Sequence, residues 1–209
     1  DEKLTLLRDA SRYLNSYGIT SVVNATSSLP EIELYAALRD RGELTVRTRN
    51  AFGAVAVKHH LTPQFLTDLE TARSRYHDDW VSANLVKFFA DGGSGMIPPL
   101  VYNPVEYKKL VLELDKHGFQ VMTHALRGDS AHMVLDTYEE VGKANGPRDR
   151  RFRMEHAEIF PPKNVTAVIA TIAMNATRIP YSARAAPSSS PINFPTASLM
   201  RATLTPWVS

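Results

Sequence analysis

Apolar side chains follow two spacings along most of the chain, one typical of amphipathic helices and the other of buried strands. Apolar positions at helical spacing predict helices over 2–17, 31–38, from 63 onward, 103–116 and 130–143. Short apolar or β-branched runs predict strands over 19–24, 44–49, 84–90, 119–124, 152–156 and 165–174. Glycine stands where helices are expected to end, at Gly18, Gly42 and Gly118.

The strands recur about every 25 to 40 residues with helices between them, which is the rhythm of right-handed βαβ units around a parallel sheet. A closed (β/α)8 barrel takes about 250 residues, whereas this chain has 209. We therefore predict an α/β fold, a partial (β/α)8 TIM-type barrel over 1–175. The Pro-, Ser- and Ala-rich stretch 176–209 is predicted to be an irregular tail.

Composition narrows the class of protein. With 44% hydrophobic and 22% charged residues the chain is typical of a folded globular protein, and no apolar run reaches the about 20 residues that span a bilayer. The absence of cysteine excludes disulfides and thiolate metal ligands, so a metal would need His or carboxylate ligands. A net charge of +2 without a basic, aromatic-rich face does not favour nucleic-acid binding. We expect a cytoplasmic protein; because the chain opens at Asp1, a removed targeting segment stays an alternative.

Three residues with reactive side chains fall near strand ends: Lys87, His124 and His156. They are 37 and 32 residues apart, one βα unit each, so parallel strands would bring them to one edge of the sheet, where active sites of such folds lie. Histidine is the commonest metal ligand. Each could equally be a structural residue: a histidine hydrogen-bonded at a strand end, or a lysine reaching the surface. An interior Lys87 between Val86 and Phe88, however, is costly unless neutralised or paired.

The other candidates are weaker. Five further histidines lie in helical or loop contexts and are predicted to be surface residues: His59, His60, His77, His117 and His132. The loop 91–95, Asp-Gly-Gly-Ser-Gly, could form a backbone nest for an anion. It is neither a P-loop nor a nucleophile elbow, because Met96 stands where the elbow needs glycine.

Three motifs occur together in order and spacing. They are Val-Lys-Phe-Phe-Ala-Asp-Gly at 86–92, Gln-Val-Met-Thr-His-Ala at 120–125 running into Gly128-Asp129, and Arg-Phe-Arg-Met-Glu-His-Ala-Glu at 151–158. Together they resemble amidohydrolase family 3, the YtcJ-like metal-dependent hydrolases. The segments 13–23 and 42–47 also look like barrel strands of that family, so the resemblance covers about residues 3 to 170.

The resemblance implies a hydrolase of amide or related C–N bonds in small molecules, with one or two divalent metal ions, usually zinc. Lys87 matches the lysine of the fourth barrel strand, which carbon dioxide can carboxylate to bridge two metals. His124 and His156 match the metal ligands of the fifth and sixth strands. The metal would polarise an amide carbonyl and activate water. Asp91 and Asp129 would support a ligand or shape a loop, and Glu155 would orient a ligand.

Two parts of the family's site have no counterpart here. The His-x-His pair of the first strand would lie ahead of residue 1, and Ser189 stands where the eighth strand carries its Asp. One hypothesis is therefore a metal-dependent hydrolase in truncated form. The other is a non-catalytic barrel fragment that associates through its open sheet, with another copy or another chain. Neither a nucleic acid nor a membrane is expected as a partner.

Overall fold

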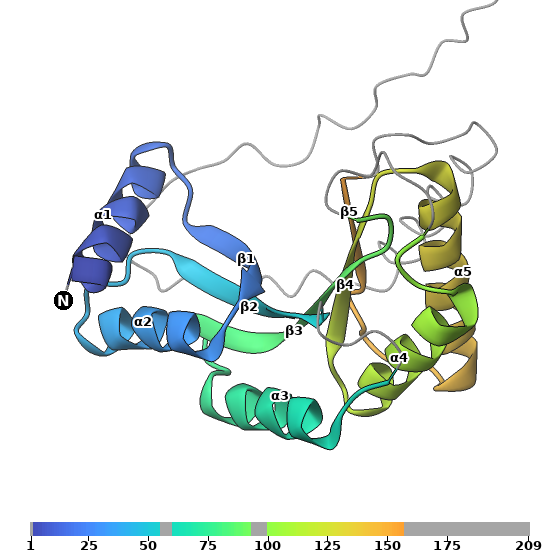
Figure 1. Cartoon of the computed structure of the whole chain (residues 1–209). Coiled ribbons are helices and arrows are strands. Elements are labelled where there is room, and N and C mark those ends of the chain that lie inside the picture. Colours follow the sequence, from blue (N-terminus) through green and yellow to red (C-terminus); the bar gives the residue numbers. More distant parts are fainter. Residues whose placement is uncertain (1, 55–59, 93–99, 157–209) are drawn as a thin grey trace, which may run out of the picture.

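The computed structural model describes residues 2–54, 60–92 and 100–156 (Figure 1). Strands and helices alternate along these ranges, as the hydrophobic pattern predicts. The elements are α1 (Glu2–Ser16), β1 (Ser21–Ser27), α2 (Leu29–Asp40), β2 (Arg47–Gly53), α3 (Pro63–Arg75), β3 (Val81–Phe89), α4 (Pro104–Lys116), β4 (Gln120–Ala125), α5 (Gly128–Ala144) and β5 (Arg153–His156).

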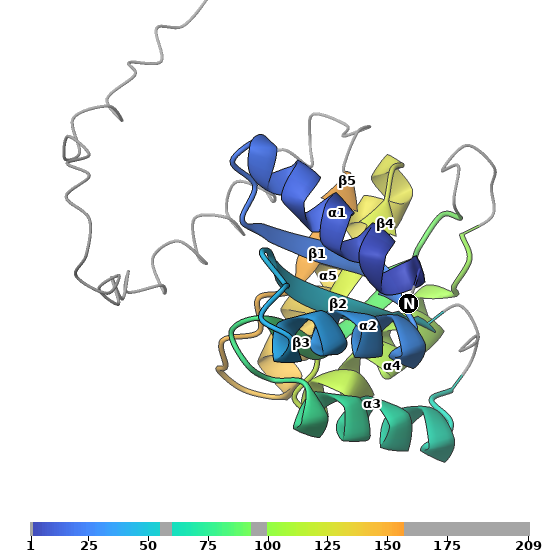
Figure 2. The same ribbon diagram turned by 90° about the vertical axis from the view of Figure 1, so that its left-hand side faces the viewer.

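The five described strands form one parallel sheet whose spatial order is the chain order, β1-β2-β3-β4-β5. The sheet curls, and the helices lie around its outer side (Figures 1 and 2). A sequential parallel sheet with outer helices is the wall of a (β/α) barrel. The predicted fold class, a partial TIM-type barrel, is confirmed.

Most helix boundaries follow signals in the sequence. The side chains of Thr62 and Asn103 accept hydrogen bonds from the backbone N–H groups of Phe65 (3.2 Å) and Val105 (2.9 Å), so they cap α3 and α4. Gly118 follows α4 with φ +80°, a left-handed conformation that ends a helix at little cost only in glycine.

One strand lies further along the chain than its residue types predict. The β-branched run 44–49 suggested a strand there, but β2 begins at Arg47 and extends to Gly53. Leu44 and Val46 are buried beside Ile32 and Leu38 of α2. They therefore fill the layer between helix and sheet before the strand begins, so their strand-like residue types reflect burial against α2 and not a place in β2.

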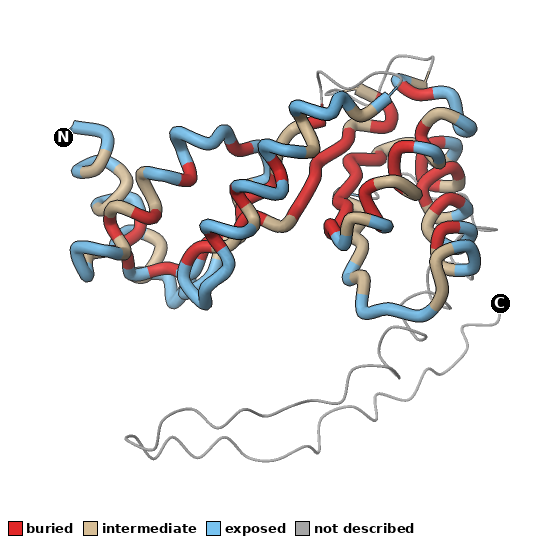
Figure 3. The backbone as a smooth tube through the Cα atoms, turned by 90° about the horizontal axis from the view of Figure 1, so that it is seen from below, coloured by how far each residue is buried: buried red, intermediate tan, exposed pale blue. Residues whose placement is uncertain are grey.

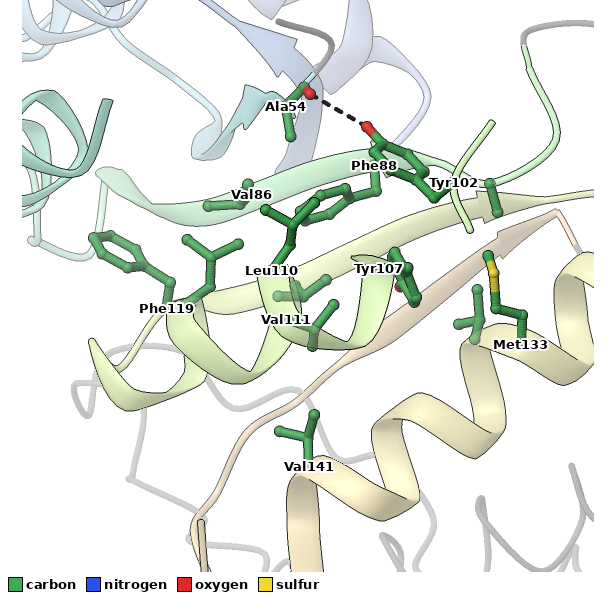
Figure 4. Packing of buried hydrophobic residues seen from close by; sticks show 14 of the residues in the cluster. Ala54, Val86, Phe88, Tyr102, Tyr107, Leu110, Val111, Phe119, Met133 and Val141 are labelled. Atoms are coloured by element: carbon green, nitrogen blue, oxygen red, sulfur yellow. Dashed lines mark hydrogen bonds between the residues drawn. The ribbon is translucent and has the colours of Figure 1, made fainter. Parts of the chain in front are cut away.

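The main core lies between the sheet and the outer helices, as the buried stretches in Figure 3 indicate. On the side of α4 and α5, Phe88 of β3 is fully buried, and its ring packs edge-on against Tyr102 and Tyr107 at centroid distances of 5.6 and 5.5 Å (Figure 4). Burying one such aromatic side chain contributes about 1.5–3 kcal/mol. On the opposite face of the sheet a small cluster forms from Ala51, Leu85 and Met122.

A chain of hydroxyl groups crosses the core and connects four elements. Tyr107 of α4 and Thr123 of β4 are 2.6 Å apart, and Thr123 is 2.9 Å from Tyr138 of α5. Tyr138 in turn donates to the carbonyl of Arg153 in β5 at 2.9 Å. Burial raises the pKa of Tyr107 and Tyr138, so both phenols stay neutral and can act as donors. These linked hydroxyl groups hold β4 and β5 in place, and both strands contribute to the candidate site.

The predicted strand 165–174, the boundary at 175 and the irregular tail 176–209 lie outside the described residues. The same holds for His59 and for most of the glycine loop 91–95. Among the described helices, none combines the length and apolarity required to cross a membrane.

Candidate metal centre

The ends of β3, β4 and β5 bring the predicted residues to one edge of the sheet. In the parallel register, Phe89 lies beside His124, and Ala125 lies beside His156. Lys87, two residues before Phe89, therefore shares a face of the sheet with His124. This face is the one opposite the outer helices, because the neighbouring Val86 and Phe88 point into the helix-side core.

The imidazoles of His124 and His156 lie against each other. Their ring centroids are 4.6 Å apart, and the rings meet edge to face at 69°. The side chain of His124 is 6% exposed, whereas His156 is exposed. The register pairs Glu155, and not His156, with His124. His156 has φ +74°, a left-handed conformation that is strained for a non-glycine residue. This turn at the end of β5 accompanies the approach of its ring to His124.

Asp91, just after β3, links that strand to the turn after β4. Its Oδ2 accepts hydrogen bonds from the backbone N–H of Leu126 (2.7 Å), the backbone N–H of Arg127 (2.9 Å) and the Ser130 hydroxyl (2.6 Å). Its Oδ1 lies 3.3 Å from Nε2 of His124. These contacts agree with the loop-shaping role expected of Asp91.

The Asp91 side chain is fully buried but ionised. Burial raises its pKa, yet the hydrogen bonds from Ser130, Arg127 and Leu126, together with the charge of His124, outweigh that effect and leave the pKa below its usual range. A buried carboxylate beside an imidazole favours a defined ring orientation, as carboxylates do for metal-binding histidines. Ser130 is the partner that the sequence did not reveal, because its role depends on a contact 39 residues away.

Lys87 is 3% exposed and lies on the face of the sheet opposite the outer helices. Its Nζ lies 5.1 Å from the centre of the Phe89 ring. Burial lowers the pKa of Lys87, Glu155 opposes this by its negative charge, and Arg153 adds to it; the net direction is downward. Glu155 is itself paired with Arg153 at 2.8 Å. The lysine is therefore the buried residue that the sequence predicted, and its neutral form is favoured relative to an exposed lysine.

Asp129 differs from Asp91 in its surroundings. It lies in the first turn of α5, pairs with the side chain of Arg127, and accepts a hydrogen bond from the Ser130 N–H at 2.9 Å. Its side chain is half exposed. An acidic side chain in the first turn stabilises a helix through the macrodipole, so Asp129 stabilises the start of α5. Asp91 instead lies beside His124 in the candidate metal centre.

The residues proposed as metal ligands are brought together in part. His124 and His156 are adjacent, whereas the described contacts of Lys87 are to Phe89 and, through charge, to Glu155 and Arg153. Within residues 2–54, 60–92 and 100–156, no group of three or more His, Asp or Glu side chains gathers closely enough to hold a metal ion. Two imidazole nitrogens and a lysine that could become anionic are a donor set suited to a divalent metal, and this set is partial.

A curled parallel sheet, outer helices and polar side chains at the C-terminal strand ends define a partial (β/α) barrel with a barrel-type site. The sequence profile of the amidohydrolase family matches residues 1–204. The chain belongs to that family. The resemblance carried by the three motifs is thereby confirmed, and the match extends over more of the chain than the motifs cover.

Two relatives have similar sequences. Protein LONG AFTER FAR-RED 3 of Arabidopsis thaliana is 30% identical over 189 residues, which cover 78% of this chain and 31% of that protein. Exoenzymes regulatory protein AepA of Pectobacterium carotovorum subsp. carotovorum is 28% identical over 177 residues, covering 78% of this chain and 37% of that protein. The chain thus spans about a third of the length of these relatives.

Two crystal structures share the fold. An uncharacterized metal-dependent hydrolase from Pyrococcus horikoshii OT3 superposes with a TM-score of 0.58 at 18% identity, over 79% of this chain and 34% of that one. Its counterpart from Pyrococcus furiosus superposes with a TM-score of 0.56 at 19% identity, over 77% and 34%. At these identities the likeness shows the fold alone.

Proposed function

We propose that this chain carries part of the metal centre of a hydrolase that acts on amide or related C–N bonds of small molecules. The observation that carries the proposal is the convergence of His124 and His156, whose ring centroids are 4.6 Å apart at the C-terminal ends of β4 and β5. Membership of the amidohydrolase family supports the reaction class, and the metal-dependent hydrolases of the same fold support a divalent metal. We take zinc as the first candidate.

In this proposal His124 and His156 bind the metal through neutral imidazole nitrogens. Asp91 holds the turn after β4 and keeps the His124 ring oriented, at the 3.3 Å distance already described. A bound divalent metal would polarise the substrate carbonyl and lower the pKa of water. The chain spans about a third of the length of its relatives. The proposed substrate and activity therefore concern a whole enzyme of that length and not this chain alone.

Lys87 becomes a ligand in this proposal by carboxylation. The cationic amine first loses one proton; the neutral nitrogen then attacks carbon dioxide, a C–N bond forms as one C=O π bond opens, and a second proton leaves the nitrogen, so that the cationic side chain becomes an anionic carbamate. Burial, which lowers the pKa of Lys87, favours the neutral amine that this step requires. The carbamate would also remove the cost of a buried positive charge.

The experiment is elemental mass spectrometry on protein purified without chelators. We expect about one or more zinc ions per chain in the parent protein and a several-fold loss in His124→Ala and His156→Ala, because each removes a donor from a site that has few. Lys87→Ala should also lower the metal content. His77→Ala is the matched control, since His77 is an exposed histidine that precedes β3, at the other end of the sheet.

A metal content that is unchanged in both His124→Ala and His156→Ala would refute the proposed centre. If metal is lost as expected, hydrolysis of N-acyl amines by the parent protein, compared with Lys87→Ala and His156→Ala, tests the reaction class. Equal rates for all three proteins would leave the chain a metal-binding fragment without the proposed activity.

A further inference from the structure

A cavity of about 220 Å³ opens at the end of the sheet where the strands begin, opposite the His124–His156 pair. Its walls come from Arg49 of β2, Asn84 of β3, Gln120 at the start of β4 and the segment 148–151 ahead of β5. Four of the lining residues are arginines: Arg49, Arg148, Arg150 and Arg151. Arg151 is the first residue of the family motif at 151–158, whereas Arg49, Arg148 and Arg150 lie outside the three motifs, and the proposed metal centre uses none of the four.

Two carboxylates offset part of this positive charge. Asp115 of α4 binds Arg148 and, through two bonds of 2.9 Å each, Arg150. Asp149 pairs with Arg151 at 2.8 Å. Four guanidinium groups thus face two carboxylates, and the cavity keeps an excess of positive charge.

Of the four arginines that line the cavity, Arg49 is the one without a carboxylate partner among the described residues. Its guanidinium donates to the neutral Oε1 of Gln120 at 3.0 Å. The side chain is half-buried, and burial together with the charges of Arg151 and Arg153 lowers its pKa. A guanidinium stays protonated in proteins even so. A half-buried cation whose ionic neighbours are other cations is a costly arrangement that an anion would relieve.

The backbone beside the cavity is strained, and Gln120 connects this point to Arg49. Arg151 has φ +49°, in the left-handed region that non-glycine residues rarely adopt. The Gln120 amide donates to the Arg151 carbonyl while its own oxygen accepts from Arg49. One side chain therefore contacts both the guanidinium of Arg49 and the backbone of Arg151. Strained residues of this kind persist where surrounding contacts over-determine them, and they cluster at ligand sites.

We propose that this arginine-lined cavity binds a phosphate group, with Arg49 and Arg151 as its principal donors. Guanidinium groups present paired N–H donors that match the oxygens of a phosphate, and they keep their charge when partly buried. The free phosphate ion and the phosphate of a small phosphomonoester share this chemistry. The site is separate from the proposed metal centre, and it does not depend on the proposed hydrolase function.

Isothermal titration of the 209-residue chain with inorganic phosphate tests this proposal, in a buffer free of phosphate and sulfate and at constant ionic strength. We expect saturable binding with a dissociation constant between about 10 μM and 1 mM. Glycerol phosphate forms the second arm: tighter binding than inorganic phosphate would identify a phosphomonoester as the ligand, and equal or weaker binding would identify the free ion.

Arg49→Gln should weaken phosphate binding at least about tenfold, because it removes the charge that no carboxylate offsets. Arg151→Gly is the second variant and protects the test against misfolding. Glycine accepts φ +49° without strain, so this variant is expected to unfold at the same or higher urea concentration while binding phosphate more weakly. Arg75→Gln, an exposed arginine on α3, is the matched control and should bind like the parent.

Absence of saturable binding by the folded parent chain would overturn the proposal. So would unchanged affinity in both Arg49→Gln and Arg151→Gly. A loss of affinity of the same size in Arg75→Gln would show a general effect of charge, and it too would overturn the assignment of these two arginines.

Discussion

The carboxylate of Asp91 joins the end of β3 to the turn after β4, and this single side chain fixes the backbone beside His124 in the candidate metal centre. It satisfies two backbone N–H groups and the Ser130 hydroxyl while lying beside His124. Hydrogen bonds to a charged acceptor are stronger than those between neutral groups. At the scale of one residue, the site therefore depends on an acidic side chain that holds the turn after β4 as well as on the two adjacent histidines.

Replacing Asp91 by alanine should destabilise the chain by about 3 kcal/mol, because each donor left unsatisfied in a buried position costs about 1–3 kcal/mol and some will regain water. Asp91→Asn keeps an acceptor oxygen and should cost less. Urea unfolding measures both, and amide hydrogen exchange should show faster exchange at Leu126 and Arg127. Asp129→Asn, at the half-exposed neighbouring carboxylate, is the control. A free energy of unfolding for Asp91→Ala within about 0.5 kcal/mol of the parent would contradict this role.

At the scale of elements, Asp115 ties α4 and α5 to the segment that leads into β5. Its carboxylate accepts from Asn145 at the end of α5 at 2.8 Å and binds Arg148 and Arg150. The side chain is 1% exposed. Burial raises the pKa of Asp115, but the hydrogen bonds from Arg150, Asn145 and Arg148 outweigh it and set the pKa below the ordinary value of 3.8. By binding Arg148 and Arg150, this carboxylate fixes where β5 begins, and with it the position of His156 at the other end of that strand.

Asp115→Asn is expected to lower the free energy of unfolding by about 2–3 kcal/mol at neutral pH, since it breaks a buried ion pair whose arginines are partly exposed. A lowered pKa means that the folded state holds the proton less tightly than the unfolded state. The stabilisation is therefore present above about pH 4 and is lost as the pH falls through the pKa of the folded state. Urea unfolding of parent and variant across this range should show their difference shrinking towards acid pH.

The matched control for this measurement is Asp149→Asn, which breaks the exposed pair with Arg151 and should cost less than about 0.5 kcal/mol. A difference between parent and Asp115→Asn that stays constant from neutral pH to about pH 3 would show that the charge of Asp115 is not what stabilises the fold.

At the scale of the whole molecule, the described strands form an open wall in which β1 and β5 are the outer strands. Outer strands of an open sheet present backbone groups that can pair with another chain. We therefore place the predicted association through the sheet at β1, the first strand of the sheet, which lies near α1 in Figure 2. Such association belongs to the chain as a whole, because it concerns a surface that no single helix or strand forms alone.

We expect the molar mass from light scattering to rise from one chain towards two as the protein concentration increases. Ala25→Lys, which places a charge at an exposed position of β1, should weaken this association without unfolding the chain, because charged side chains block edge pairing. A mass of one chain at every concentration would count against the prediction. Circular dichroism of the variant checks that its fold is retained.

Several features of this protein follow from the sequence by itself, because they depend on neighbours along the chain. The spacing of apolar residues predicted a helix or strand at or near each described element, with β2 lying a few residues further along than expected, and it predicted the order that makes a parallel barrel wall. Caps such as Thr62 and Asn103 act within three residues of their own position. The placing of Lys87, His124 and His156 at the ends of successive strands follows from the same local periodicity, since parallel strands align their ends.

Other features were decided only by the tertiary structure, because they depend on contacts between distant residues. Leu44 and Val46 have strand-forming character but are buried against α2 ahead of the strand. No local pattern predicts the left-handed backbone of His156. Nor does one relate Asp91 to Ser130, or Arg49 to Arg151, because these residues are far apart in the sequence. Local spacing thus determined which elements form and which residues reach the strand ends, whereas long-range packing and charge decided how those residues face one another.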